Sequence, residues 1–135
     1  MHEFDTVIRL QHTDGAGVVF FARFFELAHL AYEDMLDAIG QPLPRNLGRA
    51  SLILPIVHAE SDYRAALRLG DPLRVAVTVE EIRSRSFTLG YRFTRPDEQE
   101  IATLRTVHAA VDTDTGSSTS LPADLVDGLE RLRVR

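Results

Sequence analysis

The segment from Phe20 to Ile39 repeats its apolar residues with the period of an α-helix, and the apolar face that it predicts is very broad. The polar arc is narrow and consists of Arg23, Glu26, His29, Glu33, Asp34 and Asp37. Leu30 is the one apolar residue within it. The other positions are mostly apolar and include five aromatic rings. One flat neighbour cannot cover so wide a surface, so we expect a sheet that curls around this helix. Gly40 is predicted to end it as a C-terminal cap.

Five stretches in which apolar and polar residues alternate predict β-strands. One precedes the helix and four follow it, and they are Phe4 to Gln11, Leu54 to Arg68, Leu73 to Ile82, Phe87 to Phe93 and Ile101 to Val111. Short turns join the later strands, which must therefore run antiparallel. We expect these four strands to form an antiparallel meander. Residues Gln41 to Ser51 are predicted as a loop, and Pro122 to Leu132 as a short helix.

The order of one strand, one helix and four antiparallel strands is the plan of the hotdog fold, an α+β architecture. We therefore predict a long central helix wrapped by a five-stranded antiparallel sheet, with a short C-terminal helix. A chain of 135 residues is long enough for one substantial core and too short for two, which predicts a single domain over residues 1–135. Free sheet edges and uncovered apolar helix surface predict at least a homodimer.

Charge and residue types exclude several classes of protein. Fifteen basic against 20 acidic residues give a net charge of −5, which argues against a general nucleic-acid-binding protein. All the basic residues are arginine, so local clusters of guanidinium groups could still hold a phosphorylated ligand. The absence of cysteine excludes disulfides, thiolate metal sites and a cysteine nucleophile. The chain has neither a signal-peptide core nor a run of ~18 apolar residues, which predicts a cytoplasmic protein without a membrane partner.

Between the first strand and the helix lies a turn that contains Asp14, flanked by Thr13 and Gly15. It places one carboxylate beside the free amide groups that we expect at the helix start. A carboxylate next to oriented N–H groups suits attack on an acyl carbonyl, because it delivers water or attacks directly while the N–H groups hold the developing oxyanion. An Asp in this position is also a common N-cap, which contributes about 0.5–2 kcal/mol over Ala. The residues alone leave both interpretations open.

Residues 13–25, which read TDGAGVVFFARFF, resemble the signature of the 4-hydroxybenzoyl-CoA thioesterase family. That signature is an Asp-(Ala/Pro/Gly)-Ala-Gly turn followed by an apolar, aromatic helix start. Within the family, residues 54–63 (LPIVHAESDY) are most similar to the branch that hydrolyses 1,4-dihydroxy-2-naphthoyl-CoA in the phylloquinone and menaquinone pathway. The resemblance implies a cofactor-free acyl-CoA thioesterase that acts on an aromatic acyl group and forms a homodimer or homotetramer. A thioesterase for short aliphatic acyl-CoA or for acyl-carrier-protein esters, and a non-catalytic acyl-CoA-binding module, stay open as alternatives.

The resemblance also implies roles for residues of the turn. Asp14 matches the catalytic carboxylate, which acts as a general base on water or as a nucleophile. The backbone N–H groups of Gly17, Val18 and Val19 match the donors that hold the thioester oxygen. His12 either orients Asp14 or contacts the substrate, unless it faces solvent at a strand end, which is the interpretation that we favour.

Two further groups match positions that contact substrate in the family. His58 follows Pro55 on a strand that can line the pocket of a partner subunit, and a purely structural role is equally compatible with the sequence. Arg83, Ser84 and Arg85 match the turn that binds the phosphates of coenzyme A. Two arginines in a short turn are also ordinary solvated surface, but the matching position and the guanidinium chemistry favour the phosphate role. The remaining histidines show no metal-ligand spacing, so no metal site is predicted.

Overall fold

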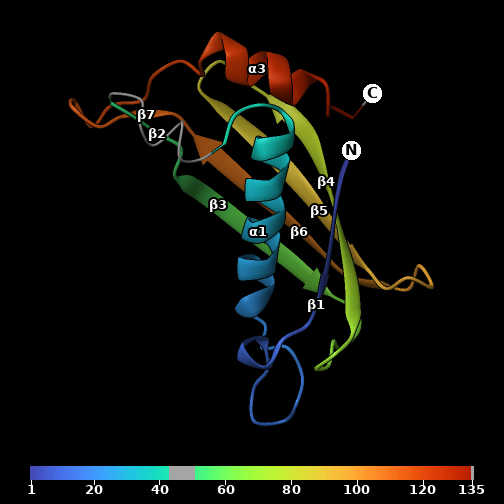
Figure 1. The fold of residues 1–135 in the computed structure, drawn as a ribbon. Helices are drawn as coiled ribbons and strands as arrows, with labels where there is room; N and C mark the ends of the chain where they lie inside the picture. Colours follow the sequence, from blue (N-terminus) through green and yellow to red (C-terminus); the bar gives the residue numbers. More distant parts are fainter. Residues whose placement is uncertain (43–50, 135) are drawn as a thin grey trace.

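The structure is a computed structural model that describes residues 1–42 and 51–134. Its elements follow one another in the order β1 (His2–Val7), the 3-10 helix η1 (Leu10–His12), α1 (Arg23–Ala38), β2 (Leu52–Ile53), β3 (Ile56–Tyr63), β4 (Pro72–Ile82), β5 (Ser86–Thr94), β6 (Glu100–Ala109), β7 (Val111–Asp112) and α3 (Ala123–Glu130). α1 lies across one face of the main sheet, and α3 covers one end of it (Figure 1). The predicted loop from Gln41 to Ser51 lies for the most part outside the described residues.

The main sheet has five antiparallel strands in the order β1-β4-β5-β6-β3, and β2 pairs with β7 in a separate ribbon. The predicted α+β fold with a five-stranded antiparallel sheet is therefore confirmed. β4, β5 and β6 form the expected meander. The prediction is wrong for β3, which pairs with β6 at the far edge instead of with β4. The first strand also ends at Val7, earlier than predicted, because the chain then turns into η1.

The connection from β3 to β4 is long enough to cross the two strands that lie between them. Residues 64–71 separate them, and eight extended residues span up to ~27 Å. The width of the two strands between them is smaller, since three strand spacings amount to about 14 Å. The connection is held on its way by hydrogen bonds from the N–H of Arg64 to the carbonyl of Ile101 and from the N–H of Gly70 to the carbonyl of Ile8. It is thus a crossing segment and not a hairpin turn.

α1 is shorter than predicted, with 16 residues that begin at Arg23. The backbone before it is bound elsewhere, because the N–H of Val19 donates to the carbonyl of Leu67 and that of Phe20 to the carbonyl of His12. Gly40, with a φ of 78°, ends the helix as predicted. The buried face of α1 consists of Phe24, Leu27, Ala28, Ala31, Tyr32, Met35 and Leu36.

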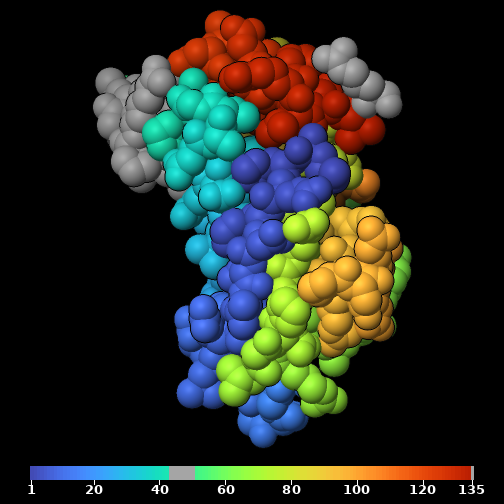
Figure 2. Space-filling view, turned by 45° about the vertical axis from the view of Figure 1, so that its right-hand side comes forward, coloured from blue at the N-terminus to red at the C-terminus, as the bar shows by residue number. Residues whose placement is uncertain are grey.

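The strands alternate between a buried inner face and a charged outer face. On β4, the inner residues Leu73, Val75, Val77 and Val79 are at most 2% exposed. The outer face carries ion pairs between strands, such as that of Arg74 with Asp5. In the space-filling view the N-terminal strand lies alongside β4, and the C-terminal segment closes the upper end (Figure 2). The core therefore lies between α1 and the inner face, and the Asp-containing turn lies at the opposite end from α3.

Candidate active site

The residues from Thr13 to Val19, called the Asp14 turn below, form a tight hairpin between η1 and α1. The N–H of Asp14 donates to the carbonyl of Val18 at 2.9 Å, and the N–H of Gly17 donates to the carbonyl of Asp14 at 3.1 Å. Gly17 has a φ of 80°, which glycine adopts easily because it has no Cβ. Asp at the first position and glycine in the left-handed position are typical of such a three-residue hairpin loop.

The carboxylate of Asp14 takes part in the turn through one of its two oxygens. Oδ1 accepts a hydrogen bond of 2.7 Å from the N–H of Ala16, which makes an Asx turn. The donor is a loop amide and not a helix-start amide as expected, because α1 begins only at Arg23. The side chain is exposed, and Oδ2 has no hydrogen-bond partner among the described residues. One oxygen thus fixes the orientation of the carboxylate, and the other is open to water or substrate.

Of the three N–H groups predicted to hold a thioester oxygen, two are already bound. That of Gly17 donates within the turn, and that of Val19 donates to the carbonyl of Leu67 at 2.8 Å. The N–H of Val18 has no acceptor in the part of the chain that the structure describes. The expectation of three donors is therefore corrected to one, because closing the hairpin and pairing it with the β3–β4 connection uses the other two.

His12 is buried, with 7% of its surface exposed, so the favoured expectation of a solvent-facing histidine is wrong. Its Nδ1 accepts a hydrogen bond of 2.9 Å from the N–H of Arg9, which places the proton of the neutral ring on Nε2. Burial lowers the pKa of His12, so the ring is neutral at pH 7. Its carbonyl accepts from the N–H of Phe20 at 3.2 Å. His12 therefore ties η1 to the segment that leads into α1, at the base of the Asp14 turn.

Three exposed aromatic side chains lie beside the Asp14 turn, and we call Phe20, Phe21 and Tyr63 the aromatic wall. Phe20 and Phe21 are 44% and 61% exposed, with ring centres 4.7 Å apart. The hydroxyl of Tyr63 donates to the carbonyl of Phe21 at 3.1 Å. The helical period predicts both phenylalanines on the apolar face of the helix, whereas they precede the helix, which begins at Arg23. The wall was missed for that reason, and only the position of the helix start could have revealed it.

The structure does not bring His58 together with Asp14. His58 lies 3.6 Å from Glu60, which pairs with Arg105 on the outer face of the sheet. Side chains two residues apart on a strand share a face, so His58 points away from α1. Its side chain is 58% exposed.

Arg83, Ser84 and Arg85 form the exposed turn between β4 and β5. Nε of Arg83 donates to Glu81 at 2.7 Å, and this hydrogen bond raises the pKa of Arg83. The guanidinium of Arg85 donates to Ser118 at 3.0 Å. Both arginines thus have partners, although exposed ones that a phosphate could replace.

The β4–β5 turn and the Asp14 turn lie at opposite ends of the molecule (Figure 1). The Asp14 turn is bonded to residues just before β4, since Val18 pairs with Arg68. The β4–β5 turn follows the last residue of that strand. A strand of 11 residues is about 36 Å long, so one chain does not place both turns on the same thioester.

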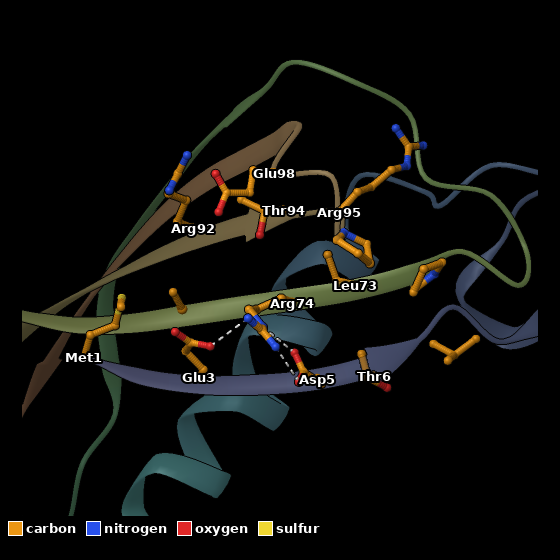
Figure 3. A pocket seen from close by; sticks show the side chains of 14 residues that line it. Met1, Glu3, Asp5, Thr6, Leu73, Arg74, Arg92, Thr94, Arg95 and Glu98 are labelled. Atoms are coloured by element: carbon orange, nitrogen blue, oxygen red, sulfur yellow. Dashed lines mark hydrogen bonds and ion pairs between the residues drawn. The ribbon is translucent and has the colours of Figure 1, made fainter.

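Two hollows lie on the outer face of the sheet, away from the Asp14 turn. The larger measures about 690 Å³ and lies between β1, β4 and the β5–β6 turn. Figure 3 shows Arg74 between Glu3 and Asp5 on its floor, with Arg92 and Glu98 across from them. The smaller, of about 400 Å³, continues over β5 and β6. Asp14 lines neither of these two hollows, and its side chain is exposed beside the aromatic wall.

Within residues 1–42 and 51–134, no group of three or more His, Cys, Asp or Glu side chains is arranged to hold a metal ion. No helix in the same residues is long and apolar enough to cross a membrane.

A family model described as the thioesterase-like superfamily matches residues 8–129 of this chain. The chain therefore belongs to the thioesterase-like superfamily, and the family resemblance predicted from the Asp14 turn is confirmed.

Individual relatives agree with the predicted branch. A 1,4-dihydroxy-2-naphthoyl-CoA hydrolase of Synechococcus elongatus is 37% identical over 130 residues, which cover 96% of this chain and 95% of the relative. The protein of the same name from Rippkaea orientalis is 33% identical, with 96% of each chain covered. The crystal structure of a 1,4-dihydroxy-2-naphthoyl-CoA thioesterase from Synechocystis superposes with a TM-score of 0.92 at 28% identity, over 97% of this chain and 96% of the other.

Proposed function

We propose that this chain is a thioesterase that hydrolyses an aromatic acyl-CoA, with 1,4-dihydroxy-2-naphthoyl-CoA of phylloquinone and menaquinone biosynthesis as its preferred substrate. The observation that carries the proposal is the Asp14 turn, which presents one open carboxylate oxygen and one free backbone N–H. The name shared by relatives that are up to 37% identical over nearly the whole chain supports the choice of substrate. We place the enzyme in the cytoplasm, as one domain.

In this proposal Asp14 acts on the thioester carbonyl in one of two ways. It removes a proton from the water that attacks the carbonyl carbon, or it attacks that carbon itself and forms a mixed anhydride that water then cleaves. In both, a C–O bond forms, the C–S bond breaks, and the electron pair leaves with the sulfur, which takes up a proton. The N–H of Val18 donates to the carbonyl oxygen as negative charge develops on it. A thioester carbonyl is weakly resonance-stabilised, so the proposal includes neither metal nor cofactor.

The acyl group packs on the aromatic wall. Phe20 directly follows the Asp14 turn, and its neighbour Phe21 is held by Tyr63 of β3. Flat apolar rings offer stacking surface to a naphthoyl group. His12 positions the turn from below without reaching the substrate. Because His58 lies on the opposite face of the sheet, it has no part in this proposal.

The functional unit in this proposal is a homodimer formed along β3. This strand is the sheet edge, and seven of its eight residues are exposed, among them Ile56 and Val57 at 44% and 61%. An exposed edge strand offers free N–H and C=O groups for pairing with a second copy. A two-fold axis at this edge continues the sheet from one chain into the other.

Such a two-fold axis reverses the direction of the partner along β3. It therefore places the upper end of one chain, as seen in Figure 1, beside the lower end of the other. The partner's β4–β5 turn lies two to three strand spacings, or about 10–15 Å, from the shared edge. On that side of the edge it approaches the Asp14 turn. Arg83, Ser84 and Arg85 thus bind the coenzyme A phosphates of a thioester whose carbonyl lies at Asp14 of the neighbouring chain.

The test is a thiol-release assay with 1,4-dihydroxy-2-naphthoyl-CoA, benzoyl-CoA and butyryl-CoA. We expect turnover of the aromatic esters, with the highest kcat/KM for the naphthoyl ester. Asp14→Asn should lower kcat at least ~10²-fold. Asparagine still accepts the hydrogen bond from Ala16, so this variant keeps the Asx turn and removes only the charge.

Asp97→Asn is the matched control, since Asp97 is an exposed residue of the β5–β6 turn whose Oδ1 accepts a hydrogen bond of 3.0 Å from the N–H of Gln99, as Asp14 accepts from Ala16. It should leave kcat unchanged. A preference for butyryl-CoA or for a carrier-protein ester would contradict the proposed aromatic substrate class. Binding of CoA esters without hydrolysis would show that the chain is a non-catalytic binding module. Full activity of Asp14→Asn would show that the carboxylate of Asp14 is not needed for hydrolysis.

A further inference from the structure

The crossing segment 64–71 supports the Asp14 turn from one side. The N–H of Val19 donates to the carbonyl of Leu67 at 2.8 Å, and Val18 lies opposite Arg68 in an antiparallel bridge. Leu67 is fully buried, so this part of the segment is anchored in the core. Because Val18 carries the free N–H of the candidate site, the place of that donor depends on the place of the crossing segment.

A side chain from the far end of β5 binds the crossing segment on both sides of this contact. Arg95 lies in the β5–β6 turn, and its side chain extends toward the segment (Figure 3). Its Nη2 donates to the carbonyl of Ala66 at 2.6 Å and to Oδ2 of Asp71 at 3.1 Å. Ala66 comes directly before Leu67, and Asp71 ends the segment. The guanidinium thus joins the two ends of the short stretch that pairs with the Asp14 turn, and we call Arg95 and Asp71 the clamp.

The carboxylate of Asp71 also closes the stretch from within. Its Oδ2 accepts from the N–H of Arg68 at 2.8 Å, and the N–H of Asp71 donates to the carbonyl of Arg68 at 3.0 Å. The hydrogen bond from the Arg68 backbone, and after it that from the Arg95 guanidinium, hold the pKa of Asp71 below its usual value. Asp71 is therefore ionised at pH 7. The side chains of Arg95 and Asp71 are only 24% and 27% exposed, so the ion pair is partly shielded from water.

Arg95 is itself fixed by its own turn. Its Nη1 donates to Oε1 of Gln99 at 2.6 Å, and its backbone N–H donates to the carbonyl of Gln99 at 3.1 Å. Three acceptors around one planar guanidinium leave it little rotational freedom. Arg92 of β5 differs from it, because its side chain is 58% exposed and approaches Glu100 at 3.7 Å.

We infer that Arg95 and Asp71 are positioning residues for the proposed hydrolysis. They hold the crossing segment where it aligns the N–H of Val18 with the carboxylate of Asp14. The inference rests on the proposed function, in which that N–H donates to the developing oxyanion. The effect of such a donor depends on its place, and a displacement of about 1 Å can cost about 10²-fold in rate. Neither side chain of the clamp contacts the substrate, so both act through the backbone.

The kinetic test uses the purified full chain and benzoyl-CoA. Arg95→Gln removes the guanidinium, whereas Asp71→Asn removes the charge and keeps an acceptor for the N–H of Arg68. Each variant should lower kcat about 10-fold and leave KM within about twofold, because the lost interaction acts in the transition state. The double variant should be no slower than the slower single variant, since the two residues act as one unit.

Amide hydrogen exchange measures the geometry without any reaction. The N–H of Val19 should exchange at least ~10-fold faster in both single variants, because the segment that holds its acceptor is loosened. The N–H of Leu89 should change less. Leu89 lies in β5, between β4 and β6, and therefore reports on the opening of the whole sheet.

Arg92→Gln is the matched control, because it removes an arginine of the same strand that lies outside the clamp. It should change neither kcat nor the exchange of Val19. Unchanged kcat in both clamp variants overturns the inference. A lowered kcat without faster exchange at Val19, or with equal acceleration at Val19 and Leu89, overturns it too. Faster exchange at Val19 alone, with no hydrolysis of any ester by the wild type, supports the clamp and rejects the proposed function instead.

Discussion

The imidazole of His108 lies fully buried, with its Nε2 2.9 Å from Oγ1 of Thr106, and that hydroxyl is 2.9 Å from the phenol oxygen of Tyr91. The ring stacks between Tyr32 and Phe87, at centre distances of 4.5 Å and 4.9 Å. Burial raises the pKa of Tyr91 to about 12 and lowers that of His108 to about 4. A polar chain therefore crosses the interior beneath α1 without any charge at pH 7.

This burial predicts that the protein loses stability in mild acid. In the unfolded chain His108 takes up a proton near pH 6.5, whereas in the fold it does so only near pH 4. Between these values the unfolded state holds more protons, so the free energy of unfolding decreases as the pH falls from 6.5 to 4. The loss from this residue is about 3 kcal/mol at most. Urea unfolding at pH 7, 5.5 and 4.5 measures it.

Two variants separate His108 from the other titrating groups. His108→Phe keeps a ring between Tyr32 and Phe87 and removes the titration, so the slope of stability against pH should become flatter between 6.5 and 4. Leu30→Ala alters an exposed, non-titrating residue of α1 and should leave the slope as in the wild type. An unchanged slope in His108→Phe would assign the acid sensitivity to other groups, among which His12 shifts in the same direction.

The Asp14 turn predicts different responses at its two glycines. Gly17 has a φ of 80°, and Gly15 does not have a positive φ, while a Cβ at either position meets nothing within 4 Å. Gly17→Ala should therefore cost about 1–2 kcal/mol of stability, because a side chain strains the left-handed backbone. It should also lower kcat by displacing the Asp14 carboxylate. Gly15→Ala is the matched control, and equal effects of both variants on kcat would show that the conformation of Gly17 is not needed.

The sequence predicts the elements of this fold better than their arrangement. The periodicity of apolar residues in α1 and in β4 to β6 depends on which residues face the core, so it can be recognised in the sequence of each element alone. The neighbour of β3 is decided by the crossing segment 64–71, whose hydrogen bonds to Ile8 and Ile101 join residues far apart in sequence. No local pattern carries that information.

The candidate site shows the same division. The residue types and spacing around Asp14 predict a carboxylate in a tight turn, because Asp and Gly have strong backbone preferences. The N–H of Val19 donates to the carbonyl of Leu67, and this contact depends on where a distant segment passes. His12 is buried where a solvent-facing position was expected. For the same reason the sequence places Arg83 beside the thioester, whereas one chain keeps it at the far end of β4.

The exposed edge of β3 predicts that a charge there prevents dimer formation. Val57 is 61% exposed at the edge, and Val57→Lys would bury a charge in the shared sheet of the proposed homodimer. We expect a monomer by light scattering and a loss of most thioesterase activity. Val134→Lys serves as the control, because Val134 is 57% exposed near the C-terminus. A dimeric Val57→Lys would place the interface elsewhere.

The aromatic wall predicts a change in substrate preference when one ring is removed. Phe21 is 61% exposed and its carbonyl is held by the hydroxyl of Tyr63, so Phe21→Ala removes the ring and keeps the backbone contact. The ratio of kcat/KM for naphthoyl-CoA to that for butyryl-CoA should fall about 10-fold, since a lost stacking surface costs the larger acyl group more. Leu30→Ala, at a position on α1 that is 43% exposed, should leave the ratio unchanged. If both esters lose activity equally in Phe21→Ala, the ring supports the Asp14 turn and does not select the acyl group.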